Sequence, residues 1–245
     1  MPFTPVLSCA FTNGFQTAMH HTITPIATAH SPYKQKFGIA RQPGLVPAAE
    51  VCIELAPSFP ADSVRGLENF DYVWISFIFH DVLTEGWSPL VRPPRLRGKQ
   101  KMGVFATRSP HRPNHLGLSL LKLERIETTR PVRLYCSGAD LLDGTPVIDI
   151  KPYIPFVEAK PDAAGGFAAA KPEELSVNWH PRCRVGQLTQ ADRDLIGQSI
   201  AQDPRPAYQD IPKRVYVMDI AAYCVKFQIK GSSALVLAVE TLRET

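Results

Sequence analysis

The sequence of 245 residues lacks several features that would place it in a familiar class. It contains no Gly-x-Gly-x-x-Gly fingerprint and no Walker A loop, so neither a Rossmann cofactor site nor a P-loop is predicted. No apolar run reaches the ~18 residues that a membrane helix needs, and the first twenty residues lack the regions of a signal peptide. The five cysteines form no Cys-x-x-Cys pair. That pattern favours reduced thiols in a cytoplasmic protein.

Acidic residues are absent from one long interval. No Asp or Glu occurs between Glu85 and Glu124, although the net charge of the whole chain is only +4. The same interval contains eight basic residues: Arg92, Arg95, Arg97, Lys99, Lys101, Arg108, Arg112 and Lys122. A one-sign block of this kind indicates an anionic partner, most commonly nucleic acid. The alternative is a solvated basic loop.

Proline is abundant, with 23 residues, and argues against a helical bundle. Apolar and β-branched runs predict strands at residues 51–55, 71–80, 102–107, 116–126, 132–139 and 147–150, and residues 22–28 alternate weakly. A short helix is expected at residues 62–68. Several short strands separated by turns predict a mainly β domain, either a barrel or a sandwich.

The chain divides into three parts. Residues 1–20 show no periodicity and are expected to be an N-terminal extension, with Met19 as an alternative start of translation. Residues 21–158 hold the predicted β domain, and the Gly/Ala-rich residues 159–170 are typical of a linker. Residues 171–245 predict a smaller α+β domain, with a helix over 189–202 capped by Thr189 and strands at 215–220, 223–229 and 235–241.

A polar loop, GVFATRSPHRPNHLG, occupies residues 103–117. Arg108 and Arg112 carry guanidinium groups suited to phosphate or carboxylate, and the Asn114 amide can both donate and accept. His111 and His115 have a metal-chelating spacing, but a proline lies between them and further ligands are lacking, so no metal site is predicted. The alternative is a structural loop held by Arg–carboxylate pairs. The absence of nearby acids favours a functional loop.

Two further segments have a plain and a functional interpretation. DLLDGTP at residues 140–146 is a turn signature, yet it places two carboxylates at a strand end, where one can bind ribose or accept a proton. QDPRPAY at residues 202–208 ends the predicted helix. Its functional interpretation is that Arg205 binds phosphate and Tyr208 stacks on a base.

Six segments taken together resemble one family. They are SPYKQKFGIARQPGL (31–45), VRGLENFDYVWISFIFH (64–80), VRPPR (91–95), MGVFATRSPHRPN (102–114), DLLDGTPVIDIKPY (140–153) and QDPRPAY (202–208). In this order they resemble the TrmO (TsaA) family of S-adenosylmethionine-dependent tRNA methyltransferases. The resemblance runs from about residue 22 to the C-terminus and is tightest over residues 31–156.

The resemblance implies a small β-barrel catalytic domain in place of a Rossmann sheet. It also implies a homodimer that binds S-adenosylmethionine near the subunit interface. The implied substrate is the tRNA anticodon loop, in which adenosine 37 already carries an N6-threonylcarbamoyl group and receives a methyl group at N6. Two alternatives remain: an enzyme of the same fold with another acceptor, and a non-catalytic RNA-binding barrel. The intact cofactor segments argue against the second.

Site residues follow from the matching motifs. The implied cofactor contacts are Arg41, Gln42, Pro43, Phe79, His80, Arg108, Leu118, Leu142, Asp143, Gly144 and Thr145. The implied RNA contacts are Arg92, Arg95, Arg112, Arg205 and Tyr208. His80 and Asp143 are the candidates for a catalytic base. One departure from the family is His115, which stands where the family usually has proline, so a less rigid loop is expected there.

Overall fold

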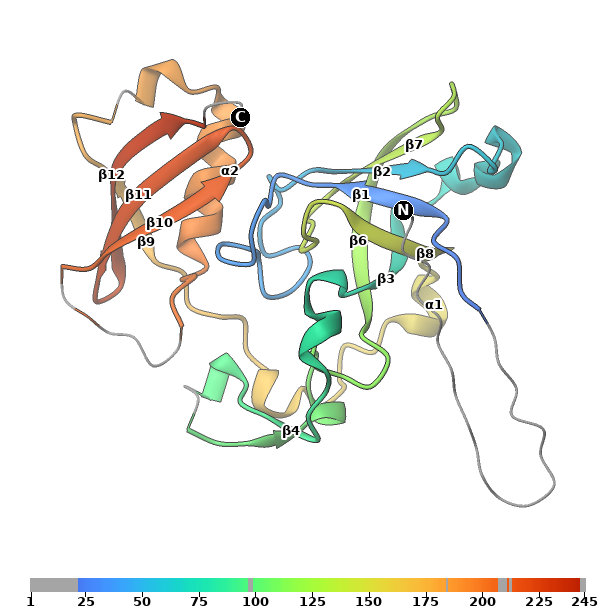
Figure 1. Cartoon of the computed structure of the whole chain (residues 1–245), viewed down its shortest axis with the longest axis horizontal. Helices are drawn as coiled ribbons and strands as arrows, with labels where there is room; N and C mark the ends of the chain where they lie inside the picture. The colour runs from blue at the N-terminus through green and yellow to red at the C-terminus, as the bar shows by residue number, and fades with distance from the viewer. Residues whose placement is uncertain (1–21, 97–98, 184, 207–210, 212, 243–245) are drawn as a thin grey trace.

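The computed structural model describes residues 22–96, 99–183, 185–206, 211 and 213–242 (Figure 1). The N-terminal extension with Met19, the basic residue Arg97 and the predicted RNA contact Tyr208 lie outside the described residues. The described chain is mainly β, with a closed six-stranded barrel and a separate four-stranded sheet that carries one long helix.

The barrel is antiparallel throughout, and its strands follow one another in the order β1-β2-β7-β6-β3-β8. The barrel core is built from every second side chain of each strand, because successive side chains of a strand point to opposite faces. In β3 the inward side chains are Val73, Ile75 and Phe77. Closure leaves no unpaired sheet edge. The strands are β1 (Ala27–His30), β2 (Val51–Leu55), β3 (Tyr72–Ile78), β6 (Leu116–Glu127), β7 (Arg133–Ser137) and β8 (Thr145–Pro152).

The end of β3 and the start of β6 approach each other closely at Phe77 and Gly117. Gly117 pairs with Phe77 across β6 and β3, and a Cβ at position 117 would lie 2.2 Å from Cζ of the Phe77 ring. The ring therefore occupies the space that any larger residue would need. Phe77 also packs edge-on against Phe79, with ring centroids 5.0 Å apart. The contact of Phe77 with Gly117 holds the end of β3 against the start of β6.

Two sequence predictions were wrong in detail. The helix expected at residues 62–68 is a pair of 3-10 turns, η1 (Ala61–Val64) and η2 (Leu67–Asn69), which Gly66 separates with a left-handed φ of 88°. The strand expected at residues 102–107 is only β5 (Met102–Gly103), which pairs with β4 (Leu90–Val91) and runs into η5 (Val104–Ala106). No barrel strand lies alongside residues 104–107, so the ladder ends after two residues.

The β4–β5 pair belongs to an arm, residues 87–96 and 99–107, that extends below the barrel in Figure 1. The remaining short helical segments of the barrel half are η3 (His80–Glu85), η4 (Pro94–Leu96) and α1 (Pro155–Glu158). The linker expected at residues 159–170 contains one further 3-10 turn, η6 (Gly166–Ala168).

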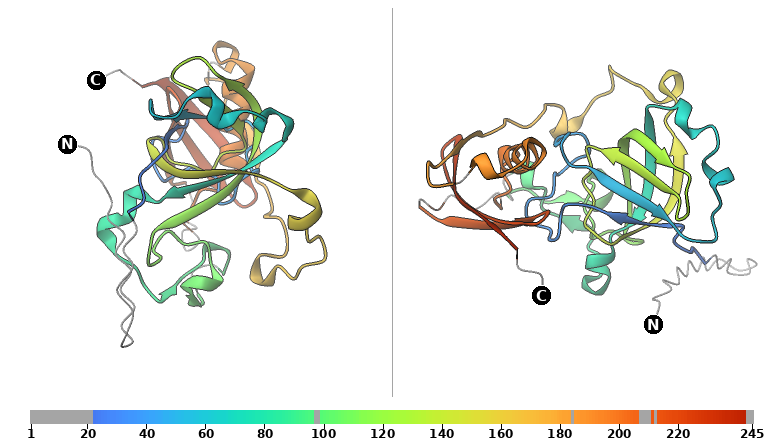
Figure 2. Two further views of the ribbon diagram at one scale, coloured as in Figure 1. Left: turned by 90° about the vertical axis from the view of Figure 1, so that its right-hand side faces the viewer. Right: turned by 90° about the horizontal axis from the view of Figure 1, so that it is seen from above.

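The C-terminal sheet has the order β10-β11-β12-β9, and α2 lies along one of its faces (Figure 2). Thr189 caps α2 as predicted, because its side chain accepts a hydrogen bond from the Asp192 amide. Strand β9, which pairs in parallel with β12, was not predicted from the sequence. The elements are β9 (Ser176–Trp179), η7 (Val185–Gln187), α2 (Gln190–Ala201), β10 (Val215–Ile220), β11 (Tyr223–Lys230) and β12 (Ser233–Thr241).

A loop of the barrel half, residues 31–49, packs into the core of the C-terminal sheet. Tyr33 is fully buried there, and its hydroxyl lies 3.4 Å from that of Ser199 on α2. Burial raises the pKa of Tyr33 to about 12. The Ala221 amide donates to the Pro32 carbonyl at 2.7 Å. The barrel and the C-terminal sheet are therefore joined through the same loop that carries the first predicted cofactor motif.

Candidate active site

A cleft of about 1120 Å³ opens at one side of the barrel. Four segments enclose it: the loop of residues 31–42, the end of β3 with the start of η3, the polar loop running into β6, and the turn between β7 and β8. Eight of the predicted cofactor residues line it, namely Arg41, Gln42, Phe79, His80, Arg108, Leu118, Leu142 and Thr145. Pro43, Asp143 and Gly144 do not.

Two of these predicted segments are joined directly. Arg108 donates from Nη1 to Oε1 of Gln42 at 2.5 Å, across 66 residues of sequence. Arg108 is exposed and faces the cleft with the rest of its guanidinium group available for an anion. Hence the polar loop and the first cofactor loop form a continuous rim.

Arg112 contacts its own loop as well as lining the cleft. Its Nη1 donates to the backbone carbonyls of Thr107 at 3.2 Å and Ser109 at 3.4 Å. The guanidinium group thus closes its own loop, which fixes the path of the backbone on both sides of Arg108. Arg112 lines the cleft but supports the loop in addition to any contact with RNA.

His115 does not loosen the polar loop, contrary to the expectation. Its amide donates to the Arg112 carbonyl at 3.0 Å, its Nδ1 lies 3.0 Å from the Pro110 carbonyl, and its own carbonyl accepts from the Phe79 amide at 2.8 Å. Its φ of 48° is left-handed. Proline, whose φ is fixed near −65°, cannot adopt this conformation. The backbone here therefore follows a path that a proline would not allow.

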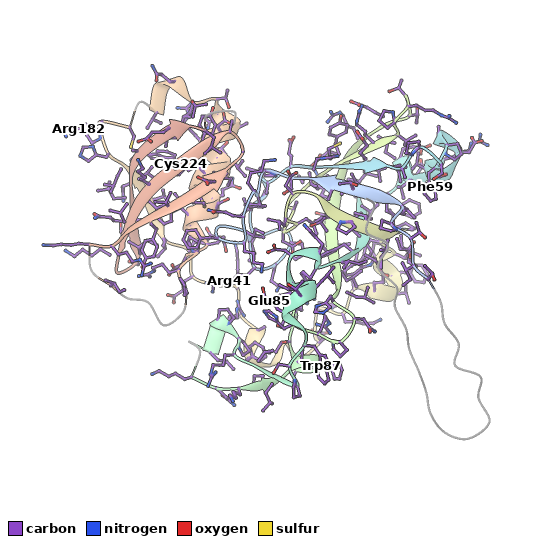
Figure 3. The ribbon with its side chains drawn as sticks, viewed as in Figure 1. Arg41, Phe59, Glu85, Trp87, Arg182 and Cys224 are labelled. Carbon is purple, nitrogen blue, oxygen red and sulfur yellow. The ribbon has the colours of Figure 1, made fainter. Side chains whose placement is uncertain are left out.

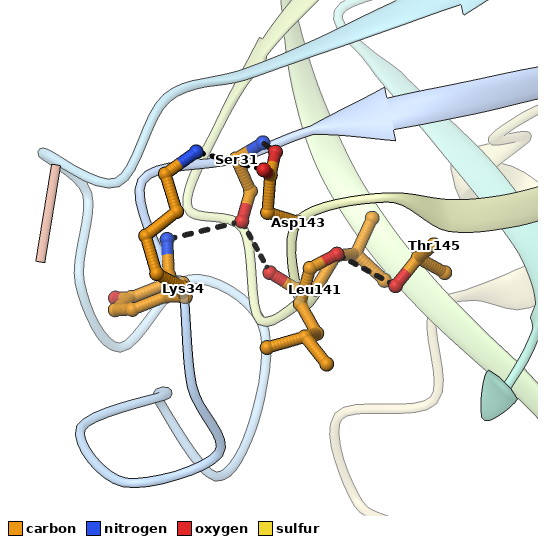
Figure 4. A network of polar contacts seen from close by, with 7 residues as sticks. Ser31, Lys34, Leu141, Asp143 and Thr145 are labelled. Atoms are coloured by element: carbon orange, nitrogen blue, oxygen red, sulfur yellow. Dashed lines mark hydrogen bonds and ion pairs between the residues drawn. The ribbon is translucent and has the colours of Figure 1, made fainter. Parts of the chain in front are cut away.

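The turn between β7 and β8 is held by a network of polar contacts (Figure 4). Asp143 accepts from the Ser31 amide at 2.9 Å through Oδ1 and pairs with Lys34 Nζ at 2.7 Å through Oδ2. The Ser31 hydroxyl donates to the Leu141 carbonyl at 2.6 Å, and the Thr145 hydroxyl donates to the Leu142 carbonyl at 2.6 Å. Asp143 therefore joins the turn to the loop of residues 31–34. Of the two residues predicted as a base, only His80 lines the cleft.

The turn does place another carboxylate in the cleft, that of Asp140. Its Oδ1 accepts a hydrogen bond of 2.6 Å from the Ser119 hydroxyl on β6. Burial raises the pKa of Asp140 to about 6, although the Ser119 hydrogen bond and the charge of Arg108 act in the opposite direction. The segment contains two carboxylates, Asp140 and Asp143, of which Asp143 was the predicted base. No local signal distinguishes them, because the path of the turn decides which one faces the cleft.

The mouth of the cleft carries exposed ion pairs. Lys36 Nζ lies 2.9 Å from Asp81 Oδ2 and 3.4 Å from Glu85 Oε1, and these partners raise the pKa of Lys36. His111 Nδ1 lies 3.7 Å from Glu85 Oε2. Figure 3 shows Glu85 on the side of the barrel that faces Arg41 and the C-terminal sheet. Exposed pairs of this kind contribute little stability, but they connect three segments around the opening.

The predicted RNA contacts are not equivalent in the structure. Arg92 is exposed on the arm, close to the exposed residues Lys99 and Lys101. Arg95 is half-buried, and its guanidinium group donates to the Ala170 carbonyl. It therefore holds the arm against the linker.

Arg205 belongs to the turn that follows α2. It forms a bidentate pair with Asp203, with Nε–Oδ1 and Nη2–Oδ2 distances of 2.8 Å each, and only 14% of its side chain is exposed. Arg41 donates to the carbonyls of both residues, at 3.1 Å and 2.9 Å. We therefore interpret Arg205 as part of the joint between the barrel and the C-terminal sheet.

Several large apolar side chains are exposed around the cleft and arm. They are Trp87 at 54% exposure, Leu90 at 51%, Phe105 at 78% and Leu118 at 53%. Exposed apolar side chains that gather in one region commonly mark an interaction site, and Phe105 and Leu118 both line the cleft. Within the described ranges, no helix is long and apolar enough to cross a membrane. No three His, Cys, Asp or Glu side chains of the described chain gather as they do around a metal ion.

The fold and the cleft define a class of protein: a closed antiparallel barrel that takes its ligand between loops, without a glycine-rich phosphate loop. Comparison with known families narrows this class. Residues 28–159 match the tRNA-methyltransferase O N-terminal domain, and residues 172–242 match the TrmO C-terminal domain. The chain belongs to the TrmO family.

Individual relatives agree with this assignment. The chain is 63% identical over 171 residues to a tRNA (adenine(37)-N6)-methyltransferase of Eikenella corrodens, which covers 70% of this chain and 97% of the relative. It is 48% identical over 198 residues to a Pseudomonas aeruginosa protein provisionally named an S-adenosylmethionine-dependent methyltransferase, covering 78% of this chain and 84% of that protein. The crystal structure of TrmO from Pseudomonas aeruginosa superimposes with a TM-score of 0.76 at 38% identity, covering 91% and 99% of the two chains.

Proposed function

We propose that this protein transfers a methyl group from S-adenosylmethionine to N6 of threonylcarbamoyladenosine at position 37 of the tRNA anticodon loop. The coarser activity, tRNA (adenine37-N6)-methyltransferase, is that of its family. The observation that carries the proposal is the cleft itself, because residues from four separate cofactor motifs surround it. We assign catalysis to residues 21–158 and a supporting role to the smaller domain, residues 171–245.

The residues around the cleft fit the proposed ligands. Its volume of about 1120 Å³ exceeds the ~300–1,000 Å³ typical of small-molecule pockets, which leaves room for a nucleoside cofactor and a second base. Phe79, Leu118 and Leu142 offer apolar walls to a purine, and Gln42 holds Arg108 at the rim of the cleft. S-adenosylmethionine, when bound, supplies an activated methyl group on a sulfonium.

The remaining task of the protein is alignment. The accepting nitrogen must lie about 3–3.5 Å from the methyl carbon, in line with the sulfur. That nitrogen belongs to a ureido group and must lose its proton. Arg108 has the exposure and the place to bind the threonyl carboxylate or a phosphate. We assign this role to Arg108 in preference to Arg112, whose guanidinium group holds the loop.

The basic arm suits the anticodon stem and loop. Arg92, Lys99 and Lys101 are exposed there in a segment without acidic residues. Contacts of this kind release counterions, so binding should weaken steeply as salt rises. Splayed bases of a hairpin loop also favour stacking on aromatic side chains. This role remains assigned to Tyr208.

A homodimer accounts for the exposed apolar side chains. Trp87, Leu90, Phe105 and Leu118 surround the cleft and arm, where a second subunit would cover them. Such a partner would also narrow the opening of the cleft. Sedimentation of the protein and of its Phe105→Glu variant tests this assignment. We expect a dimer for the parent and a shift toward monomer for the variant. A monomeric parent would contradict it.

The function is tested by methyl transfer from labelled S-adenosylmethionine to two matched tRNA preparations, one with threonylcarbamoyladenosine at position 37 and one without it. We expect label only in the first. Label in both would indicate a different acceptor, and RNA binding without transfer would indicate a non-catalytic barrel. Arg108→Ala should lower transfer, whereas Arg65→Ala, an exposed arginine outside the cleft, serves as a matched control.

A further inference from the structure

Asp140 differs from the other carboxylates near the cleft in its partners. Asp81 pairs with Lys36, Asp143 with Lys34 and Asp149 with Lys151. Among the described residues, no Lys or Arg lies within ion-pair distance of Asp140. Its hydrogen bonds come from the neutral hydroxyl of Ser119 and from its own backbone amide, so no cation is paired with it and the carboxylate can still accept a proton.

The Ser119 contact orients this carboxylate. Ser119 lies on β6 with only 1% exposure, and its hydroxyl donates to Asp140 Oδ1 at 2.6 Å. Because β6 is a barrel strand, the donor has a fixed position. Leu118 and Leu142 line the same cleft as Asp140 and Ser119.

We propose that Asp140 is the general base of the methyl transfer and that Ser119 is its positioning residue. This inference rests on the proposed function. The N6–H bond breaks, and its proton passes to the Asp140 carboxylate. The N6 electron pair forms the new bond to the methyl carbon, while the carbon–sulfur bond breaks and its electron pair stays on sulfur. The protonated Asp140 then returns its proton to water.

The surroundings match this role. The positive charge of Arg108, from the polar loop, acts to lower the pKa of Asp140. The charge of Asp140 in turn acts to raise the pKa of Tyr33, from the loop of residues 31–49. The other charged or titratable groups around the cleft are Lys36, Arg41, His80, Asp81, Arg112 and Asp149. Since burial raises the pKa of Asp140 to about 6, the carboxylate is mostly ionised at neutral pH and more basic than an ordinary aspartate.

The test compares pH profiles of kcat/KM for methyl transfer to modified tRNA. For the parent protein we expect an acidic limb near pH 6. Asp140→Asn should lower kcat by roughly 10²–10⁴-fold and remove that limb, while calorimetry shows unchanged binding of S-adenosylhomocysteine. Ser119→Ala should move the limb to higher pH, because its hydrogen bond favours the ionised form. Asp149→Asn, a matched loss of charge at the same cleft, should retain the limb.

Two results would overturn the assignment. One is an Asp140→Asn variant that keeps the parent limb and rate, with the limb lost instead in His80→Gln. The other is an Asp140→Asn variant that loses S-adenosylhomocysteine binding in proportion to its rate, which would make Asp140 a cofactor ligand. If the parent itself transfers no methyl group to modified tRNA, the proposed function fails first. Should Asp140→Asn not fold, the shift in Ser119→Ala decides alone.

Discussion

Replacing Asp140 with asparagine should make the protein more stable at alkaline pH. The folded protein raises the pKa of Asp140 from 3.8 to about 6, and burial is the main cause. Folding therefore favours the protonated carboxyl. The stability that this protonation contributes is fully present below about pH 4 and is lost as the pH rises through 6. Asparagine keeps a carbonyl acceptor for the Ser119 hydroxyl but has no charge to desolvate.

The magnitude follows from the shift. A difference of about 2 pKa units, at about 1.4 kcal/mol per unit, corresponds to about 3 kcal/mol. Only the part of this shift that lies above pH 4.5 falls within the measured range, so the stability of Asp140→Asn relative to the parent should rise by about 2 kcal/mol between pH 4.5 and pH 8. Other titrating groups are common to both proteins, so they cancel in this difference.

Urea unfolding at pH 4.5, 6 and 8, followed by circular dichroism, measures the effect by linear extrapolation. Asp71→Asn is a suitable control because Asp71 is exposed, and its difference from the parent should change far less with pH. A difference for Asp140→Asn that is the same at all three pH values would refute the reasoning. So would a variant that is less stable than the parent at pH 8.

Three other substitutions test the packing that holds the site. Gly117→Ala should cost roughly 1–3 kcal/mol of unfolding free energy, because the new methyl group meets the buried Phe77 ring; an unchanged urea midpoint would contradict this. Thr189→Ala should cost about 1 kcal/mol through loss of the α2 cap, with Thr189→Ser restoring most of it. Arg41→Ala removes two hydrogen bonds to the turn after α2, so elastase, which cleaves after small residues such as the alanines of the 159–170 linker, should cut that linker faster, and an unchanged cleavage rate would count against that joint.

Patterns close together in the sequence were sufficient for much of the fold. Alternation along β3 and β6 and the Thr189 cap of α2 are properties of consecutive residues, so each could be predicted without knowing the neighbours. The prediction of a strand over residues 102–107 was wrong because strand formation also depends on a neighbour that is distant in the sequence. These residues have strand-forming side chains, but a strand also needs a partner, and only two of them have one.

The roles of the polar side chains were decided by tertiary structure. Asp140 and Asp143 lie in one turn signature, yet Asp143 binds Ser31 from 112 residues away, whereas Asp140 faces the cleft beside Ser119. Arg112 likewise turns back onto its own loop, while Arg108 reaches Gln42. The sequence by itself determined the family, the barrel strands and the segments that form the cleft. Only the folded chain decided which charged groups face it, because a side chain's partners depend on the path of distant backbone.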